Sequence, residues 1–355
     1  MKFYPKLFLF ICMTLLGLTL FSCELKKHES KLQHINGSDT TIVLKTICFG
    51  ACNRQWEDQS YWQTIEKEKP DLWIWMGDII YCDTDHMSLM RSQYDLQKSN
   101  SEYMAFIDSV RVIGIWDDHD FGKNDGGTSF LAKKGSRDLL FDFLDIPESD
   151  PIWKREGAYQ SYVFGPDSQQ VKVFLLDGRY FRDDLLPDDN SDQRYLQNKD
   201  GTYLGDKQWQ WLENELKNNQ AKINIFVSGI QFIPTEHYFE KWYNFPIERE
   251  KFMNLISSNS VQNPMILSGD RHIGEISKTI VNGMELFEVT SSGLTHSYEK
   301  ADEENPYRVG ELISVRNFGK LDMKWEMDSL SIRYAIHDLN GNTLESVQST
   351  VKLKD

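Results

Sequence analysis

The chain alternates between short apolar runs and longer polar stretches, a pattern that predicts buried β-strands separated by helices and loops. The runs are five to nine residues long and rich in β-branched and aromatic side chains, which favours strands over helices. Between two of them, Trp209, Leu212 and Leu216 fall on one face of a predicted helix over 206–219 that Asp206 caps. We therefore expect an α/β fold. The runs are 41–49, 71–76, 110–116, 171–176, 223–228, 264–268 and 283–289.

Polar or glycine-containing clusters follow most of these runs, at the points where the predicted strands end. Any one cluster has an ordinary explanation, because aspartate often caps a helix, Gly-Asp often forms a turn and a lone histidine is usually structural. In α/β sheets, however, ligands bind outside the carboxyl ends of the strands, so clusters that repeat after successive strands are expected to converge. The clusters are 50–54, 77–78, 117–120, 177–179, 229 and 269–272.

Composition and charge limit the classes of function. The chain has 355 residues, 40% of them hydrophobic, enough to bury a sizeable core in one large domain or two ordinary ones. The net charge of −15 argues against non-specific nucleic-acid binding through a basic surface. Phosphate binding stays open, since metal ions or a few arginines can supply positive charge locally.

The N-terminal segment predicts export to the outside of the cytoplasmic membrane. Two lysines precede an apolar stretch over 7–21 that is short for a membrane span and suits a signal peptide. Residues 20–23 resemble the lipobox of bacterial lipoproteins, in which cleavage leaves Cys23 as a lipid-modified N-terminus; an uncleaved anchor and a soluble secreted form are the alternatives. We expect a signal peptide at 1–22, a polar tether at 23–40 and a folded domain at 41–355, anchored on the periplasmic or cell-surface face of a bacterial membrane.

Three cysteines remain in the predicted domain, an odd number for an oxidising compartment. Cys48 and Cys82 could form a disulfide, but burial of both as small apolar side chains is favoured. Cys52 follows a predicted strand and belongs to the polar clusters.

The donor atoms in the clusters point to metal binding. Four acidic side chains fall within twelve residues after the third predicted strand, and closely packed carboxylates cannot all stay ionised unless a cation joins them. Carboxylate oxygens from Asp78, Asp118 and Asp270 suit hard cations. Cys52 and His272 offer softer donors, so the mixed set predicts two unlike metals. Such centres activate water and stabilise the attacking and departing oxygens in phosphoryl transfer.

Two arginines are candidates for binding the substrate phosphate. Arg54 and Arg179 lie two residues beyond Cys52 and Asp177, and guanidinium groups form bidentate hydrogen bonds with phosphate oxygens. Either could instead pair with one of the many acidic side chains. For Arg179 we favour phosphate binding or support of the site.

Taken together, five motifs resemble the PhoD-like alkaline phosphatases, a branch of the calcineurin-like metallophosphoesterases. The resemblance implies a four-layer αββα sandwich with two central β-sheets and metals at the strand ends. The chain departs from the family at Ala51, where members often have serine, and in the segment before Thr41, which is too short for the β-sandwich module of longer members. The motifs are Gly50–Cys52, Gly77–Tyr81, Trp116–Asp120, Asp177–Arg179 and Gly269–His272.

The resemblance also implies an unusual metal centre, with Fe³⁺ beside one or two Ca²⁺ ions. This division agrees with donor chemistry, because Fe³⁺ favours phenolate and thiolate donors whereas Ca²⁺ takes carboxylate oxygens. The implied Fe³⁺ ligands are Cys52, Asp78, Tyr81 and His272, and the implied Ca²⁺ ligands are Asp78, Asp118 and Asp270, with Asp78 shared.

Further residues are expected to act on the substrate. His119 takes the place where related phosphoesterases keep a histidine near the phosphate, so it would stabilise charge or protonate the leaving oxygen, with its ring oriented by Asp120. Asn124 would contribute to the second metal or to the substrate.

Two segments near the predicted strand ends are rich in polar and aromatic residues. Residues 231–249 either pack as a long loop or shape a substrate pocket through Glu236 and His237; we favour the pocket, because loops above rigid strand ends often set specificity. His296, after the strand 283–289, is interpreted as structural.

Beyond residue 311 the hydrophobic positions alternate in three patches. They predict strands joined by a hairpin turn at Leu339–Asn342 that complete the second sheet over 311–355 instead of forming a new domain.

With the resemblance to the PhoD-like alkaline phosphatases, these observations predict a lipid-anchored enzyme in which a metal-bound hydroxide hydrolyses a phosphate monoester or diester. One alternative is a phosphodiesterase acting on phospholipid or nucleotide, which would use the same centre. The other is a lipoprotein that binds metal or phosphate without turnover, which would leave His119 and the arginines without a purpose.

Overall fold

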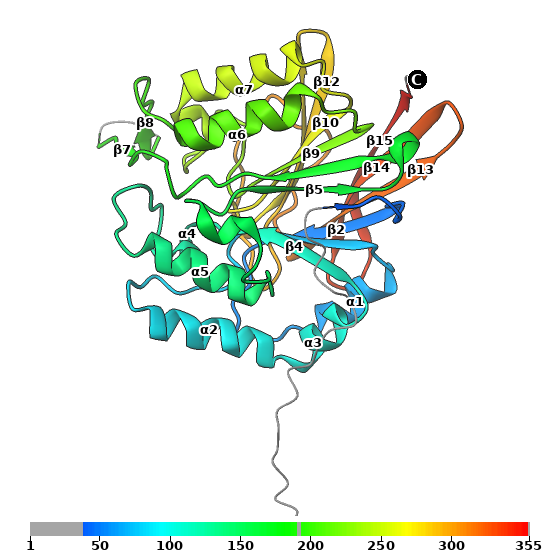
Figure 1. Ribbon diagram of the computed structural model, residues 1–355. Helices are drawn as coiled ribbons and strands as arrows, with labels where there is room; N and C mark the ends of the chain where they lie inside the picture. The colour runs from blue at the N-terminus through cyan, green and yellow to red at the C-terminus, as the bar shows by residue number, and fades with distance from the viewer. Residues whose placement is uncertain (1–37, 190–192, 354–355) are drawn as a thin grey trace, which may run out of the picture.

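Two β-sheets lie face to face at the centre of the molecule, and helices cover the outer face of each (Figure 1). The computed structural model describes residues 38–189 and 193–353. The layers form the αββα sandwich that the resemblance implies. The predicted signal peptide, Cys23 and the tether up to residue 37 lie outside the described residues. Within the described part of the chain, no helix is long and apolar enough to cross a membrane.

The first sheet has seven strands and a parallel centre. Its order is β1 (Ser38–Asp39), β5 (Gln160–Phe164), β6 (Val171–Leu175), β9 (Ile223–Ser228), β10 (Pro264–Ser268), β12 (Met284–Ser291) and β11 (Gly274–Val281). Strands β6, β9, β10 and β12 run parallel to one another, and β11 pairs antiparallel with β12 at the edge. The carboxyl ends of the four central strands therefore share one side of the sheet.

The second sheet has six strands, half of them parallel. Its order is β15 (Thr343–Lys352), β14 (Ser329–Asp338), β13 (Asn317–Trp325), β2 (Thr46–Gly50), β3 (Leu72–Met76) and β4 (Arg111–Ile115). Strands β2, β3 and β4 are parallel, whereas β13 to β15 are antiparallel and a turn at 339–342 joins β14 to β15. A short ribbon of β7 (Leu186–Pro187) and β8 (Tyr195–Leu196) lies apart from both sheets.

Successive side chains along a strand point to opposite faces of the sheet, and in the first sheet both faces carry apolar side chains that are covered. Phe174, Phe226 and Ile266 pack with two helices on the outer face, whereas Val173 and Ile225, which point the other way, belong to the core between the sheets. The helices on this face are α6 (Gly205–Lys217) and α7 (Pro246–Ser258).

Aromatic side chains attach the helices of the other outer layer. Trp62 packs edge-on against Trp73 of β3 with ring centroids 4.9 Å apart, and Phe106 lies 4.8 Å from Trp62. Each buried aromatic ring removes a large apolar area from water, which stabilises this layer. The helices are α1 (Tyr61–Lys67), α2 (Met87–Ser99), α3 (Ser101–Ile107), α4 (Asp118–Phe121) and α5 (Lys133–Phe143), with 3₁₀ turns elsewhere at Pro151–Lys154, Asp167–Gln169 and Trp242–Asn244.

The loops after the parallel strands of both sheets meet at one edge of the sandwich. The backbone N–H of Asn53 donates to the carbonyl of Asp78 (2.8 Å), and that of Gly269 donates to the carbonyl of Gly229 (2.9 Å). A Cβ on Gly269 would lie 2.7 Å from the carbonyl oxygen of Met76, so the two sheets approach too closely here for a larger residue. The polar clusters therefore converge.

Most local predictions agree with the structure, and two are corrected. The run 41–49 forms a strand only from Thr46. Asp206 lies in the first turn of α6 and does not cap it; Thr202 Oγ1 instead accepts a hydrogen bond from the first helical N–H (2.8 Å). Cys48 and Cys82 are free and buried, which confirms burial over a disulfide.

Candidate metal centre

Four of the expected metal ligands have a left-handed backbone conformation. The φ angles are 62° at Cys52, 48° at Asp78, 66° at Asp270 and 54° at His272. For a residue with a Cβ this conformation costs of order 1–3 kcal/mol and persists only where the surrounding structure holds it, typically at functional sites. These four positions follow β2, β3 and β10, where the loops converge, although other residues such as Lys69 and Asn263 also have positive φ.

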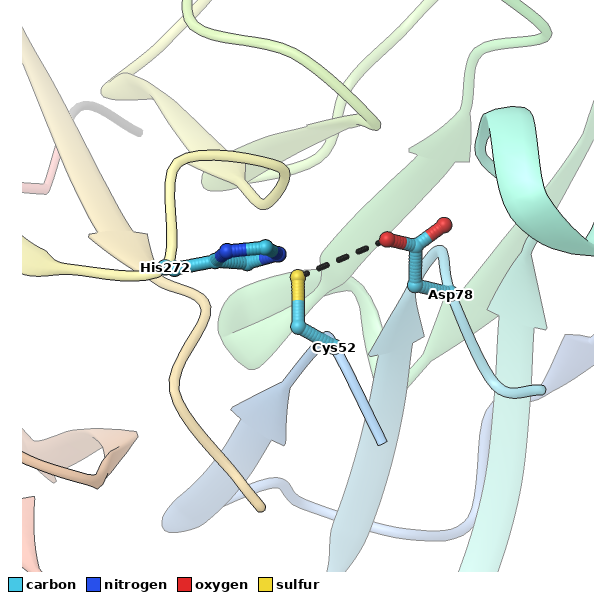
Figure 2. Close-up of side chains that lie close together, drawn as sticks. All are labelled: Cys52, Asp78 and His272. Carbon is cyan, nitrogen blue, oxygen red and sulfur yellow. Dashed lines mark hydrogen bonds between the residues drawn. The ribbon is translucent and has the colours of Figure 1, made fainter. Parts of the chain in front are cut away.

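One group of side chains combines sulfur, oxygen and nitrogen donors. The Cys52 thiol donates a hydrogen bond to Asp78 Oδ2 (3.6 Å), and Figure 2 shows these side chains pointing toward each other beside the His272 ring. One donor atom from each of the three lies within 4.8 Å of the others. Tyr81 Oη lies 3.0 Å from His272 Nε2. The four side chains that the resemblance implies as Fe³⁺ ligands therefore lie together.

A second group consists of carboxylates, of which Asp117 and Asp118 are buried and Asp270 is half-buried. Oxygens of Asp117, Asp118 and Asp270 lie within 4.8 Å of one another, and Asp78 and Asp118 form a similar group with His119. Among the described residues, Asp117 Oδ2 and Asp118 Oδ1 have no hydrogen-bond partner despite full burial. Buried carboxylates are normally paired or bound to a cation. The orphaned oxygens and the all-oxygen donor set therefore fit a hard cation.

The electrostatics of the carboxylates also favour a cation. Burial raises the pKa of Asp78 to about 7; the neighbouring Asp118 adds to this effect, and His119 opposes it. Burial likewise raises the pKa values of Asp117 and Asp270 well above their usual range. A cation bound between these groups would favour their ionised forms and remove the repulsion.

His119 lies beside the carboxylates, and its ring is held by Asp83. Its Nδ1 lies 2.7 Å from Asp83 Oδ2, and its ring centroid lies 4.3 Å from that of Tyr81. The prediction that Asp120 orients this ring is wrong, because Asp120 accepts hydrogen bonds from three backbone N–H groups instead. Burial lowers the pKa of His119, but the carboxylates of Asp78 and Asp83 outweigh that effect and raise it to about 11.

Arg179 is buried behind the carboxylates and does not face a substrate. Its Nε donates to Asp117 Oδ1 (2.7 Å) and its Nη2 to Glu240 Oε1 (2.5 Å), while Glu240 also binds Arg182. Its side chain is only 1% exposed. Of the two roles expected for Arg179, the structure therefore favours support of the site over direct phosphate binding, because Asp117 and Glu240 already occupy its donors.

Arg54 pairs with an acidic side chain, which the sequence analysis gave as the alternative to phosphate binding. Its Nη1 lies 3.2 Å from Glu57 Oε1, and its guanidinium carbon lies 5.8 Å from the centre of the Tyr81 ring. Its side chain is 40% exposed, so the arginine stays at the edge of the site.

A cavity of about 290 Å³ opens onto the carboxylates and His119. Asn124, predicted from the sequence to contact substrate or metal, lines this cavity. Two arginines that the sequence analysis did not select also line it. Arg271 is held by Glu303, whereas Arg194 is 40% exposed and lies 3.1 Å from Asp125. Arg194 is therefore the more available cation for a substrate.

The segment 231–249 reaches the cavity through Phe239, and neither Glu236 nor His237 lines it. His237 is buried with its carbonyl accepting from Lys241 Nζ (2.6 Å), and the Glu236 carboxylate binds the neighbouring Thr235 hydroxyl. The expectation that these two side chains shape the pocket is corrected, because the loop folds back on itself.

Sequence reasoning missed Asp83 and Arg194 near the site, and it interpreted His296 as structural. Asp83 was overlooked because Asp120 is closer in sequence to His119. Arg194 lies in a polar stretch with no strand-end signal. His296 follows the end of β12 as the chosen clusters follow their strands, and its Nε2 lies 3.2 Å from Tyr81 Oη, beside the expected metal ligands.

Comparison with known proteins agrees with this geometry. The profile of the PhoD-like phosphatase family matches residues 47–317. Alkaline phosphatase D of Bacillus subtilis (strain 168) is 26% identical over 315 residues, covering 74% of this chain and 51% of that protein, so the chain spans about half the length of this curated relative. A solved structure described as the structure of PhoD shares the fold, with a TM-score of 0.67 and 19% identity over 88% of this chain and 69% of the other. The chain therefore belongs to the PhoD-like phosphatase family.

Proposed function

We propose that this protein is a metal-dependent phosphoric ester hydrolase acting on phosphate monoesters or diesters. The observation that carries the proposal is the group of buried acidic side chains, with a cysteine and two histidines, at the base of an accessible cavity. Family membership supports the same chemistry. A storage protein would have no use for a histidine held by a carboxylate at the cavity wall.

The donor sets suggest where the metals bind. Phenolate, thiolate and imidazole donors suit Fe³⁺, and carboxylates suit Ca²⁺. When bound, these metals would activate a water molecule and stabilise negative charge on the phosphate oxygens. The proposed Fe³⁺ ligands are Cys52, Asp78, Tyr81 and His272, and the proposed Ca²⁺ ligands are Asp78, Asp118 and Asp270.

The chain's own residues would handle the proton and orient the phosphate. Asp83 engages Nδ1 of His119, which leaves Nε2 as the ring nitrogen available to donate a proton to the leaving oxygen. Arg194 at the cavity rim would bind a phosphate oxygen, and Asn124 would contribute a neutral polar contact. Arg179 would keep Asp117 in place from behind.

Export and lipid attachment through Cys23 complete the proposal. They rest on the signal-peptide and lipobox pattern of residues 1–23, and they place the enzyme on the periplasmic or cell-surface face of a bacterial membrane, close to exported phosphate esters. The acidic net charge makes non-specific nucleic-acid binding unfavourable.

The test is hydrolysis of chromogenic phosphate monoesters and diesters by the purified full-length protein. We expect turnover that is lost after chelation and returns with Fe³⁺ and Ca²⁺ together. Asp78→Ala should abolish turnover, since Asp78 is shared by both donor sets, whereas Asp85→Ala, at an exposed position, should not. No turnover of either ester class by metal-loaded protein, or full activity in Asp78→Ala, would contradict the proposal.

A further inference from the structure

His296 lies against the donors proposed to hold Fe³⁺. Its Nε2 is 3.2 Å from Tyr81 Oη and 3.2 Å from His272 Nε2, and Tyr81 Oη is 3.0 Å from His272 Nε2. Three polar atoms from three loops therefore form a nearly equilateral triangle. Cys52 and Asp78 lie next to it, because both belong to the same donor group as His272.

Ordinary hydrogen bonds cannot satisfy all sides of this triangle. Each imidazole nitrogen carries either one proton or one lone pair, so it makes one directional hydrogen bond, yet each Nε2 here has two close partners. Tyr81 has a single hydroxyl proton to give. A cation, in contrast, can accept a lone pair from all three atoms at once, and convergence of unfilled donor atoms is what a metal site requires.

The neighbouring residue fixes the tautomer of His296. Thr295 Oγ1 accepts a hydrogen bond from the backbone N–H of Arg54 (2.8 Å) and donates its only proton to the carbonyl of Cys52 (3.1 Å). Toward His296 Nδ1, 3.2 Å away, Thr295 Oγ1 can therefore only accept. The proton of neutral His296 resides on Nδ1, and Nε2 presents its lone pair to Tyr81 and His272.

We propose that His296 Nε2 is a further ligand of the metal held by Cys52, Asp78, Tyr81 and His272, and that Thr295 is its positioning residue. This inference rests on the proposed metal site. The arrangement matches the general rule that a metal-ligating histidine donates its other ring N–H to an oxygen that fixes its orientation. It adds a neutral nitrogen donor to a site otherwise rich in anionic ones.

The test measures iron binding and the absorption spectrum of the full-length protein loaded with Fe³⁺. The wild-type protein should show a visible phenolate-to-iron band from Tyr81. His296→Ala should shift that band and bind iron at least about 10-fold more weakly in competition with a chelator, as expected for loss of a ligand or its support. Thr295→Val, which keeps the shape but cannot accept from Nδ1, should also weaken iron binding, whereas Thr295→Ser should restore it.

Controls separate this inference from the function on which it rests. His86→Ala, at an exposed histidine, should leave iron affinity and the band unchanged, and circular dichroism should show that every variant is folded. If the wild-type protein binds iron with a visible band and His296→Ala alters neither, His296 is not a ligand, although the hydrolase proposal stands. If Thr295→Val behaves as wild type, the positioning role is excluded. If the wild-type protein binds no iron, the proposed metal site and this inference both fail.

Discussion

Replacing Arg179 with methionine tests whether this arginine supports the site or binds substrate. The side chain is 1% exposed and contacts two carboxylates, Asp117 at 2.7 Å and Glu240 at 2.5 Å. Methionine preserves much of the length and the apolar stem but removes the charge and all five N–H donors. The variant therefore leaves Asp117 without this partner and Glu240 with Arg182 alone.

The expected loss of stability is large because both carboxylates are buried. Removing one partner of a buried ion pair typically costs about 3–5 kcal/mol, since the remaining charge is desolvated and unpaired. Domains of ordinary stability unfold with only about 5–15 kcal/mol, so Arg179→Met should shift the urea midpoint strongly or prevent folding. The same cost explains why burial raises the pKa of Asp117 even though Arg179 opposes that shift.

Arg91→Met provides a matched control. Arg91 binds Asp142 at 2.8 Å, a similar distance, but the two side chains are 55% and 42% exposed. Exposed ion pairs contribute about 0–1 kcal/mol, so this variant should unfold close to the wild-type urea midpoint. Comparing the two substitutions contrasts a buried arginine that binds two carboxylates with an exposed arginine that binds one, because residue type and change are identical.

The outcome that would refute this reasoning combines stability with kinetics. If Arg179→Met unfolds at the wild-type urea concentration while its KM for a phosphate ester rises, Arg179 contacts substrate and the buried network is not its role. If the variant is destabilised and the folded fraction binds substrate with unchanged KM, the supporting role stands.

Three other perturbations have expected outcomes. Asp83→Asn should lower kcat about 10- to 100-fold and move the alkaline loss of activity to lower pH, because the Asp83 carboxylate helps raise the pKa of His119. The control variant Asp85→Asn should leave the pH profile unchanged. An unchanged profile in Asp83→Asn would contradict the prediction. Arg194→Gln should lower kcat/KM about 10-fold or more through KM, with little change in the urea midpoint, and an unchanged KM would exclude phosphate binding by Arg194. Burial raises the pKa of Glu288 to about 7, so the folded state binds its proton more tightly than the unfolded state does. The contribution of Glu288 to the free energy of unfolding should therefore fall by about 3 kcal/mol as pH rises from 4.5 to 7, and Glu288→Gln should remove this part of the slope in urea titrations at several pH values.

The sequence was sufficient for the parallel strands and for the position of the site, but it did not predict β5 and β11. Continuous apolar runs such as 223–228 predict buried strands. When such strands are parallel, the loops that follow them lie at a common edge of the sheet. Cys52, Asp78 and His272 could therefore be grouped although they lie far apart in the chain. The structure brings the donor atoms of these three within 4.8 Å of one another.

The pairing of long side chains could not be read from the sequence. Arg179 and Glu240 are 61 positions apart, and nothing in either local pattern indicates that they meet. Asp120 is next to His119 in the chain, but in the short helix α4 its carboxylate accepts hydrogen bonds from backbone N–H groups. Asp83, which is farther away in the chain, is the residue whose carboxylate contacts the His119 ring. Such choices depend on the exact path of a turn, which hydrophobic periodicity does not encode.

Four residues that carry the proposed chemistry also break local rules. Cys52, Asp78, Asp270 and His272 have strained positive φ angles, and their buried or half-buried side chains lie together with like charge or without full hydrogen bonding. Neither feature stabilises a folded chain, so both must be offset by the large core between the sheets and, in the proposed holoenzyme, by bound cations. A metal would relieve the electrostatic part directly, which couples metal binding to folding. We therefore interpret the site as a region that lowers the stability of the metal-free fold but holds the donor atoms in place before the metals bind.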